Sequence, residues 1–287
     1  MNRSPLRYPG GKSRVSNFVA KLIRDNNIVN GNYVEPFAGG AGVALNLLFD
    51  SVVDDIYIND KDRSIYAFWY SILEHTDEFI KKVASIELTV EEWKRQRTFQ
   101  FNKENASSFD LGFSTFYLNR VNRSGIIMAG LIGGLSQSGK WKMDVRFNRS
   151  DLINRITEIA KKKTHIHLTN LDAIEFLNTT VSVLDKKNTL IYLDPPYYDK
   201  GSKLYMNFFK HEDHANLRVA LSKLEYLWLV SYDNQQEIKD IYAGEKIIEY
   251  PLWYSAGPKH EGAEVMFGSE KLQMDENMNP LFIKKIA

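Results

Sequence analysis

Short apolar runs alternate along the chain with amphipathic stretches in which apolar residues recur every three or four positions. An apolar run of roughly four to eight residues predicts a buried strand, and the longer period predicts a helix. The expected strands are 33–37, 56–59, 165–169, 189–193, 227–231, 246–250 and 265–268. The expected helices include 12–25, 42–49, 63–84, 90–102, 151–162 and 211–223. This alternation is typical of an α/β domain with a largely parallel sheet.

A long, mostly helical stretch separates the second expected strand from the third. It covers about a hundred residues and ends in a loop rich in Gly, Ser and Lys, GLIGGLSQSGKWKMDVRFNRS. A gap of this length between neighbouring strands indicates an inserted domain. We therefore expect a main domain made of residues 1–62 and 151–287, interrupted by an insert at 63–150.

The composition limits the possible chemistry. With 44% hydrophobic residues, the 287-residue chain can bury a substantial core. The absence of cysteine excludes disulfides, zinc–thiolate sites and cysteine nucleophiles, and it points to a reducing compartment. No stretch approaches the ~18 consecutive apolar residues of a membrane span, and no apolar run resembling a secretory signal opens the sequence. These features predict a cytoplasmic protein.

Charge is distributed unevenly although the formal net charge is only +1. Residues 111–149 contain a single acid, Asp144, and six basic residues, which are Arg120, Arg123, Lys140, Lys142, Arg146 and Arg149. That segment therefore carries +5, and the rest of the chain carries −4.

The stretch RYPGGKSR near the start resembles the end of a phosphate-binding loop. In that motif a glycine precedes the second glycine by five positions, and an apolar strand leads into the loop. If Gly11 is the second glycine, the first should stand at position 6, where the sequence has Leu6. Too few residues lie upstream for a strand. The stretch therefore does not predict a nucleoside triphosphate site.

The stretch TLIYLDPPYYD combines an apolar strand with a rigid polar turn. The strand ends in Asp194, Pro195, Pro196 and Tyr197, and the two prolines can neither continue it nor freely begin a helix. Ligands of open α/β sheets bind at this end of the strands. A carboxylate, a backbone carbonyl and an aromatic face are suited to hold an exocyclic amine while stacking on its ring. A strand-terminating loop with a capping aspartate is the other interpretation.

The stretch YVEPFAGGAGVALNLL predicts a cofactor loop. A strand leads into Glu35, then into Gly39, Gly40 and Gly42, and then into a helix. Glycines allow a ligand to approach the backbone, and the amino end of a helix offers free N–H groups. About twenty residues later the next expected strand ends at Asp60, where an acid typically binds ribose hydroxyls. Loop and acid together fit an adenosine-containing cofactor.

In this order the motifs resemble those of the Dam-type (alpha-group) adenine-specific DNA methyltransferases. The family shares an amino-terminal aromatic-x-G-G-K, a glycine loop after E-P-F, an acid ending the next strand, a target-recognition insert and D-P-P-Y. FYLNRVNRSG, SYD and GAEVMF resemble further stretches of the family, so the resemblance spans nearly the whole chain. It implies a Rossmann-like S-adenosylmethionine-dependent methyltransferase sheet with an inserted, mainly helical target-recognition domain.

The resemblance also implies the cofactor and its contacts. S-adenosylmethionine is expected, with Tyr8 and Lys12 at its methionine portion, Asp60 at the ribose and Asp172 at the adenine edge. The full expected set is Tyr8, Gly10, Gly11, Lys12, Glu35, Phe37, Gly39, Gly40, Asp60, Asp172 and Asp194. Asn170 and Asp172 could equally cap the helix that follows.

The reaction implied by the resemblance is methyl transfer to the 6-amino group of an adenine that has left the duplex. Asp194 and the Pro195 carbonyl would accept hydrogen bonds from the amine, Pro196 would keep the turn rigid, and Tyr197 would stack on the ring. Alignment then matters more than a strong base. Cytosine carbon-5 methylation needs a thiol and is excluded.

Double-stranded DNA is the partner that the resemblance implies, and the basic insert would read it. The expected DNA-binding residues are Asn119, Arg120, Asn122, Arg123, Ser124, Lys140, Lys142 and Arg146. A solvated basic face is the alternative. We further expect a nucleoid-associated protein without membrane attachment, either monomeric or weakly dimeric. A cognate restriction endonuclease would fit as a second partner.

Three alternatives stay open at this point. Methylation of an RNA adenine or guanine amine would use a similar turn. A DNA-binding regulator that has lost catalysis would keep the fold and the insert. The spacing of His211 and His214 is compatible with a metal, but a polar helix start explains both residues, and no metal site is expected.

Overall fold

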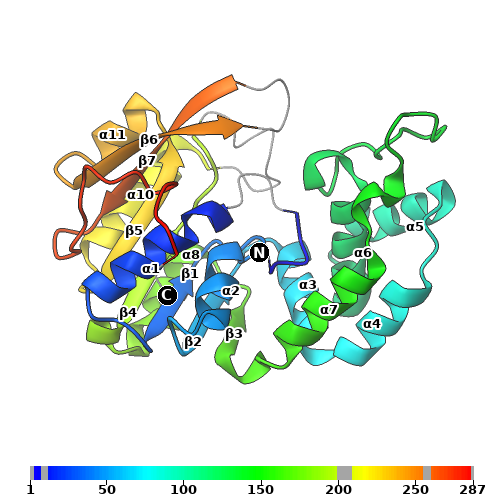
Figure 1. Cartoon of the computed structure of the whole chain (residues 1–287), viewed down its shortest axis with the longest axis horizontal. Coiled ribbons are helices and arrows are strands. Elements are labelled where there is room, and N and C mark those ends of the chain that lie inside the picture. The colour runs from blue at the N-terminus through cyan, green and yellow to red at the C-terminus, as the bar shows by residue number, and fades with distance from the viewer. Residues whose placement is uncertain (1–2, 8–11, 199–208, 255–259, 286–287) are drawn as a thin grey trace.

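The computed structural model of the protein describes residues 3–7, 12–198, 209–254 and 260–285. A central sheet carries helices on both faces, and a second group of helices lies beside it (Figure 1). Within these ranges, no helix combines the length and the apolar character needed to cross a membrane.

The described strands form one seven-stranded sheet in the order β3-β2-β1-β4-β5-β7-β6. They are β1 (Asn32–Glu35), β2 (Asp55–Asn59), β3 (Ile166–Thr169), β4 (Thr189–Leu193), β5 (Leu227–Asp233), β6 (Lys246–Tyr254) and β7 (His260–Gly268). β1 to β5 run parallel, whereas β7 lies antiparallel between β5 and β6. Strand order reverses between β1 and β4, and open α/β sheets bind ligands at such a switch point. The expected strands are therefore present, and the Rossmann-like α/β fold class is confirmed.

Alternation along the central strands divides the apolar core into two clusters. Leu190 and Tyr192 of β4 belong to one cluster, whereas Ile191 and Leu193 belong to the other. Successive strand residues point to opposite faces, so a strand that is apolar throughout must be covered on both sides. β4 is buried at all five of its positions, which matches its place in the middle of the sheet.

Helices cover both faces of the sheet (Figure 1). Residues of α1 (Ser16–Asp25) and α2 (Gly42–Phe49) pack into the first cluster. Residues of α8 (Ala173–Asn178), α10 (His211–Ser222) and α11 (Gln236–Ile241) pack into the second. The helix expected over 12–25 begins as a 3-10 turn, η1 (Lys12–Val15), before it continues as α1. The short 3-10 turns η4 (Lys163–His165), η5 (Val181–Val183) and η6 (Lys186–Asn188) lie in the connections.

The chain between β2 and β3 forms a separate group of helices, which we call the helical unit (residues 63–160). It consists of α3 (Arg63–Glu74), α4 (Thr76–Ser85), α5 (Val90–Phe101), α6 (Ser108–Val121), η2 (Arg123–Gly125), η3 (Met143–Arg146) and α7 (Arg149–Ala160). The single helix expected over 63–84 is two helices. His75, with φ −124° and ψ 39°, leaves the helical conformation between them.

Aromatic side chains form the core of the helical unit. The rings of Phe68, Phe79 and Phe116 lie within 6.1 Å of one another, centroid to centroid. Gly112 lets α6 approach α3, because a Cβ at this position would overlap the Ala67 carbonyl oxygen. The indole of Trp69 donates to the Gly39 carbonyl at 2.9 Å and so links the unit to the sheet.

Helix α7 crosses the boundary expected near residue 150. The sequence places its residues at the start of the second half of the main domain. In the structure α7 packs against α3 and α4 of the helical unit. The division of the chain into domains stays a prediction, and this packing favours counting α7 with the insert.

Candidate active site

The residues expected to carry the chemistry gather where β1, β2 and β4 end. These strands run parallel, so their carboxyl ends meet at one edge of the sheet. Glu35 closes β1, Asp60 follows β2, and Asp194 follows β4. Tyr8, Gly10 and Gly11 lie outside the described residues.

Asp194 lies half-buried at the centre of this edge, with 24% of its side chain exposed. The Ser231 hydroxyl donates to Asp194 Oδ1 at 2.9 Å, and Lys12 Nζ lies 3.4 Å from the same oxygen. Burial raises the pKa of Asp194 to about 6, Lys12 opposes that rise, and Glu264 adds to it. The carboxyl group is therefore ionised at neutral pH and protonates in mild acid.

Lys12 is buried beneath the turn. Its ammonium donates to Glu264 Oε1 at 2.6 Å and to the Tyr197 hydroxyl at 3.2 Å. Burial alone would lower the pKa of Lys12, but Asp194, Tyr197 and Glu264 together raise it well above its ordinary value. Lys12 thus stays charged where most lysines would not be tolerated.

Tyr197 is 3% exposed, and hydrogen bonds with Lys12 and Glu264 hold its hydroxyl. Its hydroxyl donates to Glu264 Oε1 at 2.8 Å, and Lys12 Nζ lies 5.1 Å from the centroid of its ring. Pro195 is buried and Pro196 half-buried beside it. The structure thus brings the predicted Lys12, Asp194 and Tyr197 together, although they are far apart in the sequence.

Glu264 is a residue of this cluster that the sequence analysis did not single out. It is fully buried on β7 and takes hydrogen bonds from Lys12, Tyr197 and the Tyr250 hydroxyl, the last at 2.6 Å to Oε2. A lone acid within the apolar run GAEVMF was the available signal. Only the fold shows which cation neutralises it.

The glycine loop after β1 has the expected geometry. Gly39 has a φ of 46° and Ala41 a φ of 45°, so the backbone turns sharply before α2 begins at Gly42. The Asp60 carboxylate accepts from the Gly39 N–H at 2.9 Å and from the Asp62 N–H at 2.9 Å. Burial, followed by the charge of Asp62, raises the pKa of Asp60 to about 7.

Phe37 and Glu35 differ in their exposure to solvent. The Phe37 ring is half-buried, with the edge of Phe209 at 5.7 Å between centroids. Glu35 is buried, and its Oε1 accepts from the Tyr33 hydroxyl and from the Ala44 N–H, both at 3.1 Å. Burial raises the pKa of Glu35 to about 8. These bonds tie β1 to the first turn of α2, so Glu35 supports the loop.

Asp172 caps α8, as the alternative interpretation expects. Its Oδ1 accepts from the Ile174 N–H at 3.0 Å, and its other oxygen pairs with Lys61 Nζ at 3.0 Å. Partial burial would raise the pKa of Asp172, but the Lys61 ammonium and the helix N–H groups hold it below its ordinary value. Asn170 bonds the Asp60 carbonyl and does not cap the helix. A contact between Asp172 and a cofactor stays a prediction.

Asn119 and Asn122 lie inside the helical unit, which corrects their expected role in reading DNA. The Asn119 amide accepts from the Arg7 N–H at 2.7 Å and donates to the Arg7 and Gly125 carbonyls. The Asn122 amide accepts from the Trp93 indole and donates to the Ile126 and Ile127 carbonyls. Both amides are used by the fold, so neither is free to bond a base edge.

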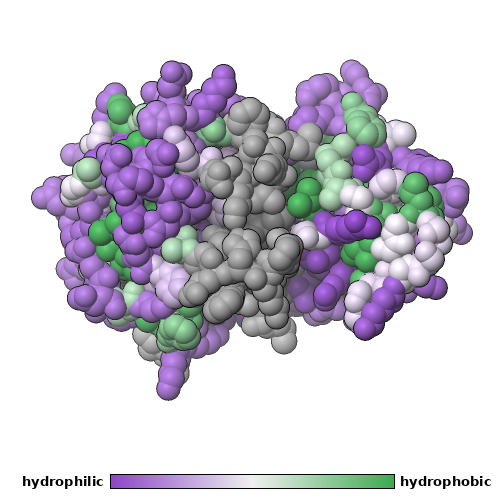
Figure 2. All heavy atoms as spheres, turned by 90° about the horizontal axis from the view of Figure 1, so that it is seen from above, coloured by the Kyte–Doolittle hydropathy of each residue, from purple (hydrophilic) through white to green (hydrophobic). Residues whose placement is uncertain are grey.

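The other expected DNA-binding residues divide by exposure. Arg120 is buried, whereas Arg123, Ser124, Lys140, Lys142 and Arg146 are exposed. Ser124 has a φ of 56°, so its backbone takes the left-handed conformation within η2. Apolar side chains also interrupt the largely polar surface of the helical unit (Figure 2), and Leu135 and Trp141 of the loop between η2 and η3 (residues 126–142) are among the exposed ones.

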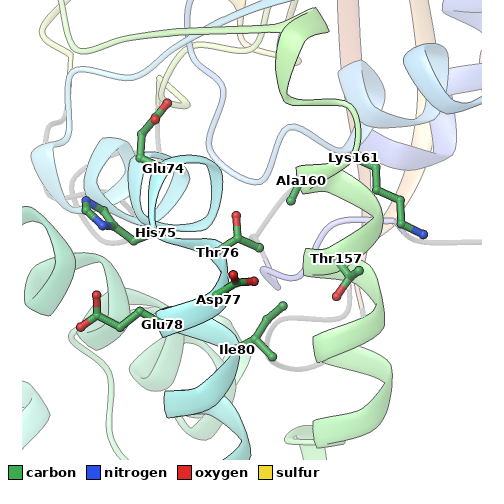
Figure 3. Close-up of a pocket in the computed structure, with 9 residues that line it drawn as sticks. All are labelled: Glu74, His75, Thr76, Asp77, Glu78, Ile80, Thr157, Ala160 and Lys161. Carbon is green, nitrogen blue, oxygen red and sulfur yellow. The ribbon is translucent and has the colours of Figure 1, made fainter.

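A cavity of about 660 Å³ lies between α3–α4 and α7, away from the cluster around Asp194 (Figure 3). Its lining includes Glu74, Asp77 and Glu78, against the single cation Lys161. An acidic lining repels phosphates, so this cavity does not suit DNA. His211 and His214 lie elsewhere, at the polar start of α10, and bond Tyr198 and Tyr232.

The chain has a Rossmann-like sheet with an Asp-Pro-Pro-Tyr turn at its switch point, next to a glycine loop, and a family model shows that it is a methyltransferase. This family model, D12 class N6 adenine-specific DNA methyltransferase, matches residues 8–254. The chain belongs to this family, and its reaction is adenine-specific methylation of DNA.

The chain is also similar to a curated protein and to several solved structures, two of which follow. The chain is 21% identical over 238 residues to the type II methyltransferase M.MjaIII of Methanocaldococcus jannaschii, covering 76% of this chain and 77% of the relative. A conserved hypothetical protein of Streptococcus pyogenes aligns over 85% of this chain and 89% of its own, with 11% identity and a TM-score of 0.33. The protein yhhF of Escherichia coli, described as a methyltransferase, aligns over 90% of this chain and 86% of its own, with 11% identity and a TM-score of 0.34.

Proposed function

We propose that S-adenosylmethionine donates the methyl group and binds at the carboxyl edge of β1, β2 and β4. The left-handed Gly39 opens the backbone before the amino end of α2, and the half-buried carboxylate of Asp60 lies beside it. Bound there, the cofactor supplies an electrophilic methyl group on a sulfonium. The proposed contacts are Lys12, Glu35, Phe37, Gly39, Gly40, Asp60, Asp172 and Asp194, with Tyr8, Gly10 and Gly11 beyond the described residues.

The turn after β4 would hold the target adenine. Asp194 Oδ and the Pro195 carbonyl accept hydrogen bonds from the 6-amino group, which directs the nitrogen lone pair out of the ring. Ser231 and Lys12 fix the carboxylate and keep it ionised. The new N–C bond would form as the methyl group leaves its sulfonium, and the amine would then lose a proton, which the Asp194 carboxylate would receive. Stacking by Tyr197 belongs to the same proposal.

The observation that carries these assignments is the buried cluster of Lys12, Asp194, Tyr197 and Glu264. A desolvated ammonium between two carboxylates is costly unless the geometry is good and a function retains it. Structural ion pairs also occur in cores. This one, however, includes the residue that closes the central strand at the ligand-binding edge.

The critical test is Asp194→Ala. We expect methyl transfer to adenine in duplex DNA to fall by roughly 100-fold or more, while the circular dichroism spectrum and melting temperature stay close to wild type. Transfer is measured with radiolabelled cofactor, and single-molecule sequencing of methylated DNA locates the modified base. A variant with wild-type transfer would refute the role of Asp194. Wild-type protein that modifies cytosine would refute adenine as the target.

Two further measurements address the alternatives. Structured RNA offered beside duplex DNA distinguishes RNA amine methylation, because transfer to RNA alone would replace the DNA substrate. Calorimetric titration with S-adenosylmethionine distinguishes a regulator without catalysis, because such a protein need not bind the cofactor. Saturable binding by wild-type protein and weaker binding by Lys12→Ala would support the cofactor site.

The helical unit is proposed to hold the DNA against this edge. Support comes from its exposed basic residues Arg123, Lys140, Lys142 and Arg146, because phosphate contacts fix a protein's register on a duplex. We keep the insert at 63–150 as its expected boundary, with α7 packed onto it. A monomeric or weakly dimeric state and a cognate restriction endonuclease stay part of the proposal.

A further inference from the structure

Four arginines from four different segments converge beside the last turn of α6. They are Arg7, Arg120 of α6, Arg146 of η3 and Arg155 of α7, and we call them the arginine cluster. The Asn119 amide accepts from the Arg7 N–H and donates to the Arg7 carbonyl, and these two bonds bring Arg7 next to Arg120. Arg120 Nη1 donates to the Arg146 carbonyl at 3.5 Å.

The cluster holds more positive charge than the fold neutralises. Asp151 pairs with Arg155 at 2.9 Å. Arg120 Nε and Arg7 Nη1 are buried, and neither has a hydrogen-bond partner in the described part of the chain. Arg120 is 8% exposed. Burial, together with the charges of Arg155, Arg7 and Arg146, lowers the pKa of Arg120 to about 9, and Asp151 opposes this shift only weakly.

An arrangement of this kind is costly in the free protein. Buried donors without partners and like charges at close range both destabilise a fold. A single anion bound among them would satisfy the free N–H groups and offset the repulsion. Guanidinium groups present donors in a planar fork that fits phosphate oxygens in pairs.

We propose that the arginine cluster binds one phosphate of the DNA backbone. The proposal rests on DNA as the substrate and deepens it, because it assigns Arg120 to a phosphate and adds Arg7 and Arg155, which the sequence did not indicate. Phosphate contacts position a duplex without reading its sequence. Arg7 precedes Lys12 by five residues, so the Cα atoms of Arg7 and of the active-site Lys12 lie at most ~18 Å apart.

The test measures DNA affinity as a function of salt. Fluorescence anisotropy with a short duplex gives the slope of log K against log salt, which changes by ~0.9 for each phosphate contact. We expect Arg120→Gln to reduce the slope by about 1 and to weaken target and unrelated duplexes by the same factor. Arg7→Gln, which leaves α6 intact, should reduce the slope in the same direction if Arg120→Gln does not fold.

Arg218→Gln is the matched control. Arg218 is a partly buried arginine of α10 whose charge Glu245 already neutralises, so its loss should leave the salt slope unchanged. An unchanged slope in both Arg120→Gln and Arg7→Gln, with wild type that binds and methylates DNA, would overturn the phosphate site alone. Wild-type protein that does not methylate duplex adenine would instead overturn the proposed function. Loss of specificity for one base position only would show that Arg120 reads a base.

Discussion

Glu264 organises three side chains of the candidate active site at once. Its Oε1 accepts hydrogen bonds from Lys12 and Tyr197, and its Oε2 accepts one from Tyr250. Lys12 also lies 3.4 Å from Asp194, the proposed acceptor of the amine. The position of Asp194 therefore depends on Glu264 through Lys12, although the described contacts include none between the two carboxylates. Glu264 is thus a positioning residue, and its loss should affect the reaction through its neighbours.

We predict that Glu264→Gln lowers kcat by roughly 10–100-fold. Hydrogen bonds to charged groups contribute about 1.5–3 kcal/mol each, and the substitution weakens the one to Lys12 most. Steady-state kinetics with duplex DNA measure the change. Glu249→Gln is the matched control, since Glu249 is an exposed carboxylate of β6 paired with Lys239, and its variant should keep wild-type kcat.

The pH profile separates positioning from a purely structural role. Wild-type activity should fall as the pH drops below about 6, because Asp194 then gains a proton and can no longer accept from the amine. Glu264 raises the pKa of Asp194, so Glu264→Gln should move this acidic limb to lower pH. A variant with a reduced melting temperature and an unmoved limb would show that Glu264 only supports the fold.

At the scale of elements, the sequence predicted the strands well and the helix packing poorly. Apolar runs such as 189–193 are bounded by polar turns, so burial alone defines them. The break at His75 could not be predicted, since the side-chain periodicity continues from α3 into α4. Likewise the pairing of Glu264 with Lys12 joins residues 252 positions apart. Local patterns contain no information on such a contact.

Close approach of α3 and α6 gives a prediction at this scale. Gly112→Ala should destabilise the protein by about 1–3 kcal/mol, because the added methyl group overlaps the Ala67 carbonyl and forces the helices apart. Urea unfolding followed by circular dichroism measures the loss. Gly130→Ala is the control, since a Cβ there meets nothing within 4 Å. Equal stability of the two variants would contradict a tight crossing at Gly112.

At the scale of the whole molecule, the charge divides between the two parts of the fold. The helical unit (63–160) carries a net charge of +3, of which the segment 111–149 contributes +5, while the residues outside the unit carry −2. We propose that the chemistry takes place at the edge of the sheet and that the helical unit binds the DNA phosphates. DNA must therefore contact both parts, and mutations should weaken DNA binding and cofactor binding separately.

The loop between η2 and η3 (residues 126–142) gives a prediction in which DNA binding changes and cofactor binding does not. Lys140 and Lys142 flank Trp141, which is 61% exposed and has Lys140 Nζ at 5.6 Å from its ring centroid. We predict that Lys140→Gln combined with Lys142→Gln lowers DNA affinity several-fold near physiological salt and reduces the salt slope by up to about 2. The affinity for S-adenosylmethionine should not change, because the loop does not contribute to the sheet edge.

Replacement of Lys161 and Lys162, which directly follow α7, by Gln provides the comparison. Lys161 pairs with Glu158 and lines the acidic cavity. This double replacement by Gln removes two charges and should leave the salt slope as in wild type. If both double variants lose affinity equally, net charge alone attracts the DNA, and the loop has no specific place on the duplex. A loss confined to the Lys140 and Lys142 variant would locate the duplex on the face that carries Trp141.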